Sequence, residues 1–144
     1  MFAVANTDIN WFTQLRNDNL GTSLVNFWTP TPWNISKLNK GANLYFMLKS
    51  PIRKIGGYGK FFSYENMTAS KAWNSFGRNN GVESLAELID RTTSYATKHS
   101  KFSVAPDPSI GCIILSDTVF FDDSSFLKEQ SLGIKFPKQI VKLK

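Results

Sequence analysis

The sequence predicts an α+β fold in which a small, curved β-barrel of about six strands is flanked by helices. Two apolar, aromatic-rich runs at 44–48 and 55–64 enclose a short polar break, which is typical of an antiparallel hairpin. Helical patterns occur only near the N-terminus and between residues 67 and 97. Adjacent antiparallel strands with separate groups of helices favour α+β over a βαβ series.

Length and composition predict one domain that covers residues 1–144 and is long enough to bury a substantial core. The chain ends on a strand pattern without a stop signal, so we expect a domain excised from a longer polypeptide. There are 17 Lys and Arg against 11 Asp and Glu, a formal net charge of +6 that suits a polyanionic partner. Aromatic residues make up 14% of the chain, more than an ordinary core requires.

The N-terminal part predicts a strand, a helix and a second strand. After an apolar run at 2–5, Asp8 is a candidate N-cap, and the helix runs to about residue 17 with Trp11 on its buried face. A strand follows at 24–28. Two prolines then separate Trp28 from Trp33, which predicts a stiff loop outside the sheet ladder.

Three glycines lie in the second strand of the central hairpin, at positions 56, 57 and 59. Glycine weakens a strand unless a bulge, a tight bend or a close ligand requires it. We therefore predict a bent hairpin whose glycine-rich half leaves room for a flat group to approach.

The C-terminal half predicts two helices and two or three strands. The spacing of Ala69, Ala72, Trp73 and Phe76 predicts a helix over 67–76, with Gly77 at its end. A capping box at 84–87 opens a helix that reaches about residue 97, and 98–108 is a polar connector. The run 110–121 contains a buried strand with a possible break after residue 116, and 140–144 alternates like a strand.

The residues offer little catalytic chemistry. Cys112 lies in an apolar run and is expected to be buried, and His99 is the single histidine, so no catalytic triad or zinc site is predicted. Asp122 and Asp123 are expected in a solvated turn. No apolar run of 18 residues and no signal sequence is visible, so we expect a cytoplasmic protein without a metal, a cofactor or a membrane partner.

The remaining signal is a combination of rings and cations, the pair of features that a base and its phosphate require. Trp28 and Trp33 flank the stiff loop, and Tyr58 lies among the glycines. Cations surround the central hairpin. For either tryptophan, the alternative is that its ring closes the end of the barrel. Arg78 begins an Asn-Asn-Gly loop, for which phosphate contact and a plain exposed loop are both open.

Five stretches resemble the N-terminal domain of HNH restriction endonucleases, which is similar to the EVE/PUA-like group that includes the YTH and ASCH domains. They are VNFWTP (25–30), LYFMLK with Ser-Pro (44–51), IGGYGKF (55–61), AWNSFGRNNG (72–81) and IGCIIL through Phe-Phe (110–121). The resemblance covers nearly the whole chain. It implies a PUA-like barrel that accepts a flipped modified base in an aromatic pocket.

The resemblance also implies roles for particular residues. The base-pocket candidates are Asn26, Phe27, Trp28, Trp33, Ser50 and Tyr58. The phosphate-binding candidates are Lys49, Arg53, Lys54, Lys60 and Arg78. An HNH motif is absent from this chain, so we expect the nuclease to be a second domain of the same polypeptide and this chain alone not to cleave DNA.

The leading hypothesis is therefore a domain that recognises 5-methylcytosine, 5-hydroxymethylcytosine or a methylated adenine in double-stranded DNA. An RNA-binding module of PUA or ASCH type is the first alternative, and 2′-hydroxyl contacts would distinguish it. A nucleotide-processing enzyme of the same fold would require an ionisable residue with a shifted pKa in the cavity. A structural interaction domain would bury both Trp28 and Trp33.

Overall fold

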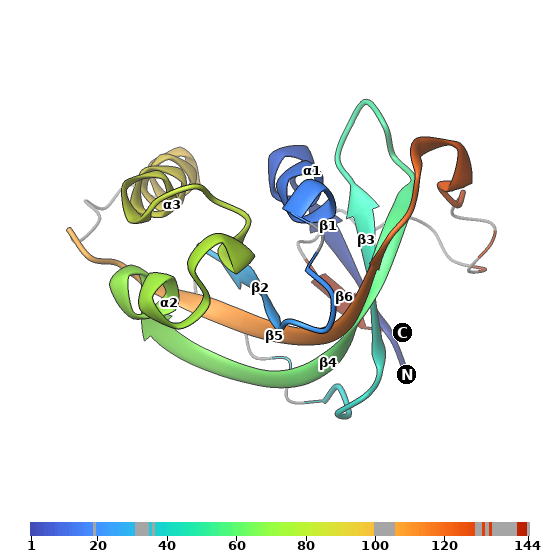
Figure 1. The fold of residues 1–144 in the computed structure, drawn as a ribbon, viewed down its shortest axis with the longest axis horizontal. Helices are drawn as coiled ribbons and strands as arrows, with labels where there is room; N and C mark the ends of the chain where they lie inside the picture. The colour runs from blue at the N-terminus through green and yellow to red at the C-terminus, as the bar shows by residue number, and fades with distance from the viewer. Residues whose placement is uncertain are drawn as a thin grey trace.

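The computed structural model describes residues 1–18, 20–30, 35, 37–99, 106–128, 131, 133 and 141–143. Helices and strands are mixed along this part of the chain (Figure 1). In chain order the elements are β1 (Ala3–Thr7), α1 (Ile9–Asp18), β2 (Val25–Thr29), β3 (Asn43–Leu48), β4 (Ile55–Thr68), α2 (Ala69–Phe76), the 3₁₀ helix η1 (Gly77–Asn80), α3 (Leu85–His99), β5 (Ser109–Phe120), the 3₁₀ helix η2 (Asp123–Ser125) and β6 (Val141–Leu143).

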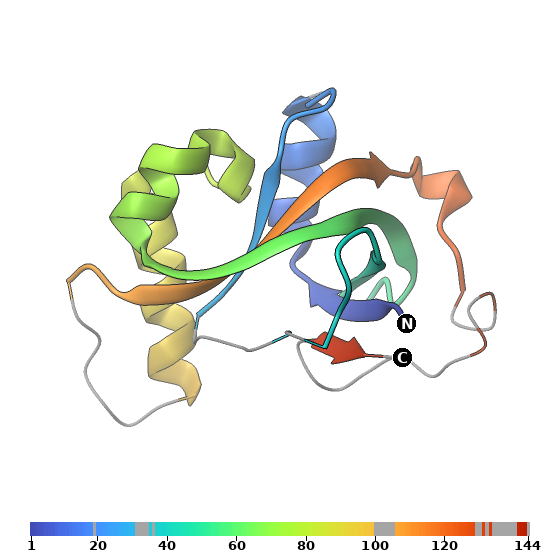
Figure 2. The same ribbon diagram turned by 90° about the horizontal axis from the view of Figure 1, so that it is seen from below.

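All six described strands belong to one sheet, in the order β2-β5-β4-β3-β1-β6. The pairs are antiparallel except β1 with β3, which run parallel. The long strands β4 and β5 bend strongly, so that the sheet curls without closing (Figures 1 and 2). The predicted α+β fold with a curved sheet and flanking helices is thus confirmed. No helix in the described residues is long and apolar enough to cross a membrane.

Strand β5 is one continuous strand where the sequence left a break open. Asp117 has a φ of 49° and lies in a register shift between β4 and β5, between the pairs Tyr58 with Val119 and Lys60 with Ser116. A bulge of this kind bends a strand and increases its twist without ending its pairing. The turn chemistry at Ser116-Asp117 therefore produces a bulge.

The glycines of β4 contact the protein's own atoms. A Cβ at Gly56 would lie 2.9 Å from the ring of Phe12, and one at Gly57 would overlap with the backbone carbonyl of Val119. The expectation that this half of the hairpin leaves room for a ligand is therefore wrong. The glycines allow close packing across the bent sheet, which is the alternative use of glycine in a strand.

The first core fills the inside of the curved sheet beneath α1. Trp11, Phe12 and Leu15 form the buried face of the helix, as the sequence predicted. The ring of Trp11 makes edge contacts with Phe27 and Phe46, both at 5.2 Å between centroids. Aromatic pairs in this geometry add about 0.5–1.5 kcal/mol beyond their buried area.

A second core lies where α2 and α3 cover the other face of β5. Ala72 of α2, Leu88 of α3 and Ile110 of β5 are completely buried there, and Trp73 packs against them from a half-buried position. The predicted helix start at residue 67 is wrong by two residues, because residues up to Thr68 still pair with β5. Thr68 caps α2 by accepting from the amide of Lys71.

The third cluster lies on the outer face of the sheet at β1, β3 and β4. Val4, Met47 and Ile55 are completely buried there. Leu127, which follows η2, exchanges two backbone hydrogen bonds with Ile55. The C-terminal part of the chain therefore covers one end of this outer face.

Candidate functional site

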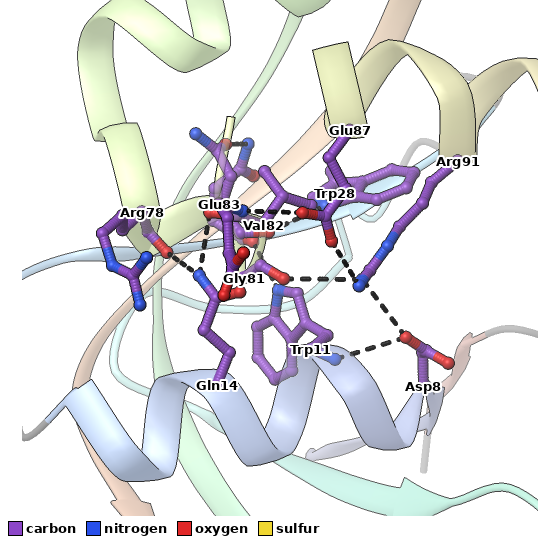
Figure 3. Close-up of polar contacts among 12 residues, drawn as sticks. Asp8, Trp11, Gln14, Trp28, Arg78, Gly81, Val82, Glu83, Glu87 and Arg91 are labelled. Carbon is purple, nitrogen blue, oxygen red and sulfur yellow. Dashed lines mark hydrogen bonds and ion pairs between the residues drawn. The ribbon is translucent and has the colours of Figure 1, made fainter. Parts of the chain in front are cut away.

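The turn formed by residues 78–82 is held in place by side chains from three other elements (Figure 3). From α1, the amide of Gln14 donates to the carbonyls of Arg78, at 3.3 Å, and Val82, at 2.8 Å. From α3, Arg91 donates to the carbonyl of Gly81 at 3.4 Å. Since the carbonyls of this turn are used by side chains, its backbone has a fixed shape.

From β2, Trp28 reaches the same turn. Its indole Nε1–H donates to the carbonyl of Asn80 at 3.0 Å. The ring is half-buried and packs against both large cores. Trp28 thus presents part of its ring to solvent while its polar edge is held. If this ring only closed the end of the barrel, we would expect it to be fully buried, whereas Trp28 is half-buried.

Asn80 is completely buried, and its hydrogen bonds decide the orientation of a second amide. Its Nδ2 donates to the carbonyls of Ala72, at 3.0 Å, and Gly77, at 2.8 Å. Its Oδ1 is therefore an acceptor, and the group 2.9 Å away on Asn26 must be the donor Nδ2. The same Nδ2 lies 3.2 Å from Sγ of Cys112.

The other end of this amide, Oδ1 of Asn26, is buried and has no hydrogen-bond partner among the described residues. Asn26 and Trp28 lie two positions apart on β2 and therefore point to the same face. Both contact Asn80 on that face. A buried acceptor without a donor costs about 1–3 kcal/mol and calls for an explanation.

A polar cleft of about 420 Å³ opens between α1 and the segment from η1 to α3. This volume lies within the range of small-molecule sites. Carboxylates, guanidiniums, amides and one hydroxyl line the cleft. The lining residues are Asn10, Thr13, Gln14, Asn17, Asp18, Arg78, Glu83, Glu87 and Arg91.

Both guanidiniums of the cleft are already paired. Arg78 donates two hydrogen bonds to Asp18, at 2.8 and 3.2 Å, and this hydrogen bonding raises the pKa of the guanidinium. Arg91 lies 2.6 Å from Glu87 and 3.4 Å from Asp8. The cleft therefore has a mixed charge, and the predicted phosphate ligand Arg78 is engaged by a carboxylate.

The other predicted phosphate ligands lie away from this cleft. Lys49, Arg53 and Lys54 are exposed in the turn between β3 and β4, and Ser50, a predicted pocket residue, is exposed beside them. Lys60 is exposed on β4. These cations form a basic hairpin, by which we mean residues 49–54 and Lys60.

Of the five predicted pocket residues that the structure describes, it brings together two, Asn26 and Trp28. Phe27 points into the first core, where its ring is stacked on Phe46 at 6.3 Å. Tyr58 lies on the outer face of the sheet with its ring 6.0 Å from that of Tyr45. Trp33 lies outside the described residues.

Asn80 and Gln14 belong to the site, although the sequence analysis missed them. An Asn-Asn-Gly run is typical of an exposed turn, and a glutamine on a helix is typical of a solvated face. The sequence signals for Asn80 were the phosphate contact left open for its loop and its place in the stretch that carried the resemblance.

The described residues contain no group of three or more His, Cys, Asp or Glu that could hold a metal ion. Cys112 is buried, as expected, and desolvation raises the pKa of its thiol to about 11. The thiol is therefore protonated at neutral pH. Asp122 and Asp123 are exposed, as expected, and Asp123 pairs with Arg16 at 2.7 Å.

The α+β fold of this chain is similar to the fold of solved ASCH structures. The solved structure of ASCH from Zymomonas mobilis is similar over 97% of this chain and 85% of that chain, with a TM-score of 0.60 and 10% identity. Its tyrosine-to-phenylalanine variant gives a TM-score of 0.58 with 10% identity over 97% and 87% of the two chains. No family model and no curated protein matches the sequence. At this identity the likeness concerns the fold.

Proposed function

We propose that this chain is a nucleic-acid-binding module. The PUA-like fold supports this proposal, and so does the net charge of +6. The basic hairpin supports it further, because its lysines and its arginine are exposed. Exposed Lys and Arg side chains bind phosphates without regard to sequence and supply much of the affinity for nucleic acid.

The observation that carries base recognition is the pairing of Trp28 with Asn26 on one face of β2. Trp28 is partly exposed, and Asn26 offers an acceptor that has no donor among the residues that the structure describes. Stacking contributes about 1–3 kcal/mol per base, and the exocyclic amino group of cytosine or adenine is a donor that fits Oδ1. Together these contributions are large enough to offset the cost of extruding a base, which is a few kcal/mol.

The burial of Asn26 adds a requirement. Because this side chain is completely buried, a base reaches Oδ1 only when the ring of Trp28 or the 78–82 turn moves. The Trp28 ring and the 78–82 turn are joined by the hydrogen bond from Trp28 to the carbonyl of Asn80. Binding is therefore expected to change the fluorescence of Trp28.

Within this proposal, the favoured ligand is a modified base in double-stranded DNA, flipped out of the helix. The domain would direct a nuclease in the same polypeptide to modified sites and would itself do no chemistry. The resemblance of the sequence stretches supports this assignment.

Recognition of RNA is the second candidate. The likeness to ASCH structures across nearly the whole chain favours it. The two ligands differ at the 2′-hydroxyl, which a protein can use to distinguish RNA from DNA.

The test is a fluorescence-anisotropy titration at fixed salt with matched oligonucleotides. The DNA duplexes are unmodified or carry 5-methylcytosine, 5-hydroxymethylcytosine or N6-methyladenine, and an RNA of the same sequence completes the set. Trp28→Ala removes the stacking ring, whereas Trp28→Phe keeps a ring and loses the hydrogen bond to Asn80. Trp73→Ala is the matched control, since it truncates a half-buried tryptophan on α2.

We expect a preference of at least tenfold, about 1.4 kcal/mol, for one modified duplex. Trp28→Ala should abolish it, and Trp28→Phe and Trp73→Ala should retain most of it. A preference for RNA that depends on Trp28 would replace modified DNA as the ligand. Equal binding to every probe, lost with salt and unaffected by Trp28→Ala, would overturn base recognition.

A further inference from the structure

The outer face of the sheet carries a row of rings that lies apart from the site on β2. Tyr45 of β3 pairs with Tyr58 of β4 in the antiparallel register, so both side chains point to the same face. Phe62 lies four residues beyond Tyr58 on β4, and its side chain is partly exposed. We call Tyr45, Tyr58 and Phe62 the aromatic row.

Phe62 is exposed because of a bulge. The register between β4 and β5 shifts between Phe61 and Ser63, which leaves Phe62 as the extra residue. Phe61 points into the first core, whereas 39% of Phe62 is exposed. Bulges often redirect a side chain, and here the result is a phenylalanine ring in contact with water.

Cations lie among these rings. Nζ of Lys40 lies 4.4 Å from the centre of the Phe62 ring, and Lys60 is exposed between Tyr58 and Phe62 on β4. Lys60 has no ion pair with any residue that the structure describes. Along β4, therefore, an exposed lysine lies in the sequence between two partly exposed rings.

We propose that the aromatic row binds unpaired nucleotides of a single strand. Bases stack on the partly exposed rings of Tyr58 and Phe62, and the ammonium groups of Lys60 and Lys40 contact the phosphates. Single-stranded nucleic acid is bound in this way elsewhere, by rings that stack bases and cations that follow the backbone. The inference rests on the proposed nucleic-acid function but concerns a surface apart from Trp28 and Asn26, which shares Lys60 with the basic hairpin, and a different form of the ligand.

The alternation favours nucleic acid over a protein partner. Lysine is depleted at the centre of protein–protein interfaces. Here Lys60 lies between the two rings on the same strand. A duplex is also a poor fit, because its base faces are stacked on one another and cannot reach the rings.

The probe is a fluorescein-labelled twelve-nucleotide homopolymer, either thymidylate or uridylate, with a self-complementary DNA duplex of equal length for comparison. Phe62→Ala removes a ring that is already partly exposed, so the fold is retained. Ile9→Ala is the matched control, because Ile9 is 38% exposed on α1, far from this row in the sequence. Lys60→Gln tests the phosphate contact.

We expect Phe62→Ala to weaken homopolymer binding by about fivefold or more, the effect of losing one stacked base. Lys60→Gln should lower the slope of log K against log salt by about 0.7, the value for one contact to a single strand. Ile9→Ala should bind the homopolymer like the unmodified protein.

The proposal is overturned if the unmodified protein does not bind either homopolymer, or if Phe62→Ala and Ile9→Ala have the same effect. These results are independent of the modified-base proposal, which Trp28→Ala tests on duplexes. Loss of homopolymer binding in Phe62→Ala with intact duplex recognition would separate the two surfaces.

Discussion

Trp28 on β2 donates a hydrogen bond of 3.0 Å to the carbonyl of Asn80, the last residue of η1. Asn80 in turn accepts a hydrogen bond on its side chain from Asn26, two residues before Trp28. The edge strand and the turn are therefore one hydrogen-bonded unit. Any movement of the Trp28 ring that admits a base must alter the turn, and through Gln14 the turn is tied to α1.

The first prediction concerns the buried centre of this unit. Asn80→Ala removes three side-chain hydrogen bonds and leaves the carbonyls of Ala72 and Gly77 without their donor. We expect the free energy of unfolding to fall by about 2–4 kcal/mol. Urea denaturation measures this change in the free energy of unfolding.

Asn79→Ala is the control. It loses a single hydrogen bond to the carbonyl of Leu24 and should cost about 1 kcal/mol. Equal effects of the two substitutions would contradict the central role of Asn80.

The second prediction compares two glycines with positive φ. Gly81 has a φ of 71°, and a Cβ there would overlap with Cδ1 of Trp11. Gly77 has a φ of 52° but open space around it. Gly77→Ala should cost about 1–3 kcal/mol, because a φ of 52° with a ψ of −129° is a conformation that only glycine adopts readily. Gly81→Ala should cost clearly more, because Trp11 belongs to the first core and has to move. Thermal unfolding of both variants checks this order, and a smaller loss for Gly81→Ala would be inconsistent with the contact.

The sequence predicted most of the elements of this fold, because their signals are local. The buried face of α1 is present, and so is half of the capping box of α3. The Glu87 amide donates to Oγ of Ser84 at 3.1 Å, whereas the Glu87 carboxylate accepts from the amide of Glu83 at 3.0 Å. The end of β4 was missed. The strand continues to Thr68 because it pairs there with β5, more than 40 positions away in the chain. The residues around Thr68 alone do not predict a contact at that distance.

The site was predicted less completely, for a related reason. The site residues were predicted from runs of consecutive residues, but the side chains of consecutive residues on a strand point to opposite faces. Asn26 and Trp28 therefore share a face, whereas Phe27 between them enters the core. Tyr58 lies on the outer face because its partner in the register is Tyr45. The burial of Asn80 arises from contacts with β2 and α2, which the sequence of a turn does not encode.

The third prediction concerns pH. Burial raises the pKa of the Cys112 thiol from its ordinary 9.0 to about 11. Above pH 9 the unfolded chain loses this proton while the folded protein keeps it, so the free energy of unfolding falls as pH rises from about 9 to about 11. The loss is on the order of 2 kcal/mol.

Other groups also titrate in this range, so the measurement is the difference between two curves. Denaturation of the unmodified protein and of Cys112→Ala is followed from pH 8 upward in steps. The stability of the unmodified protein should fall toward that of the variant as pH rises. Two parallel curves would show that the thiol is not protected from solvent by the second core.

The fourth prediction concerns the basic hairpin. Lys54 is exposed next to Ile55 and has no ion pair with a described residue, so it is available to a phosphate. A lysine that contacts a phosphate of duplex DNA releases counterions, and removing it lowers the slope of log K against log salt by about 0.9. Lys54→Gln should therefore weaken binding to every duplex by the same factor and leave any preference among modified bases unchanged.

Lys71 on α2 is the matched control, because it is also exposed and its loss changes the net charge equally. Lys71→Gln should leave the salt slope at its original value, since a charge without a phosphate contact releases no condensed counterion. Titrations of both variants at three or more salt concentrations give the two slopes. If both slopes fall together, the affinity follows the overall charge of the domain and the hairpin has no particular part in binding. A lower slope for Lys54→Gln alone would locate the phosphate backbone at the turn between β3 and β4.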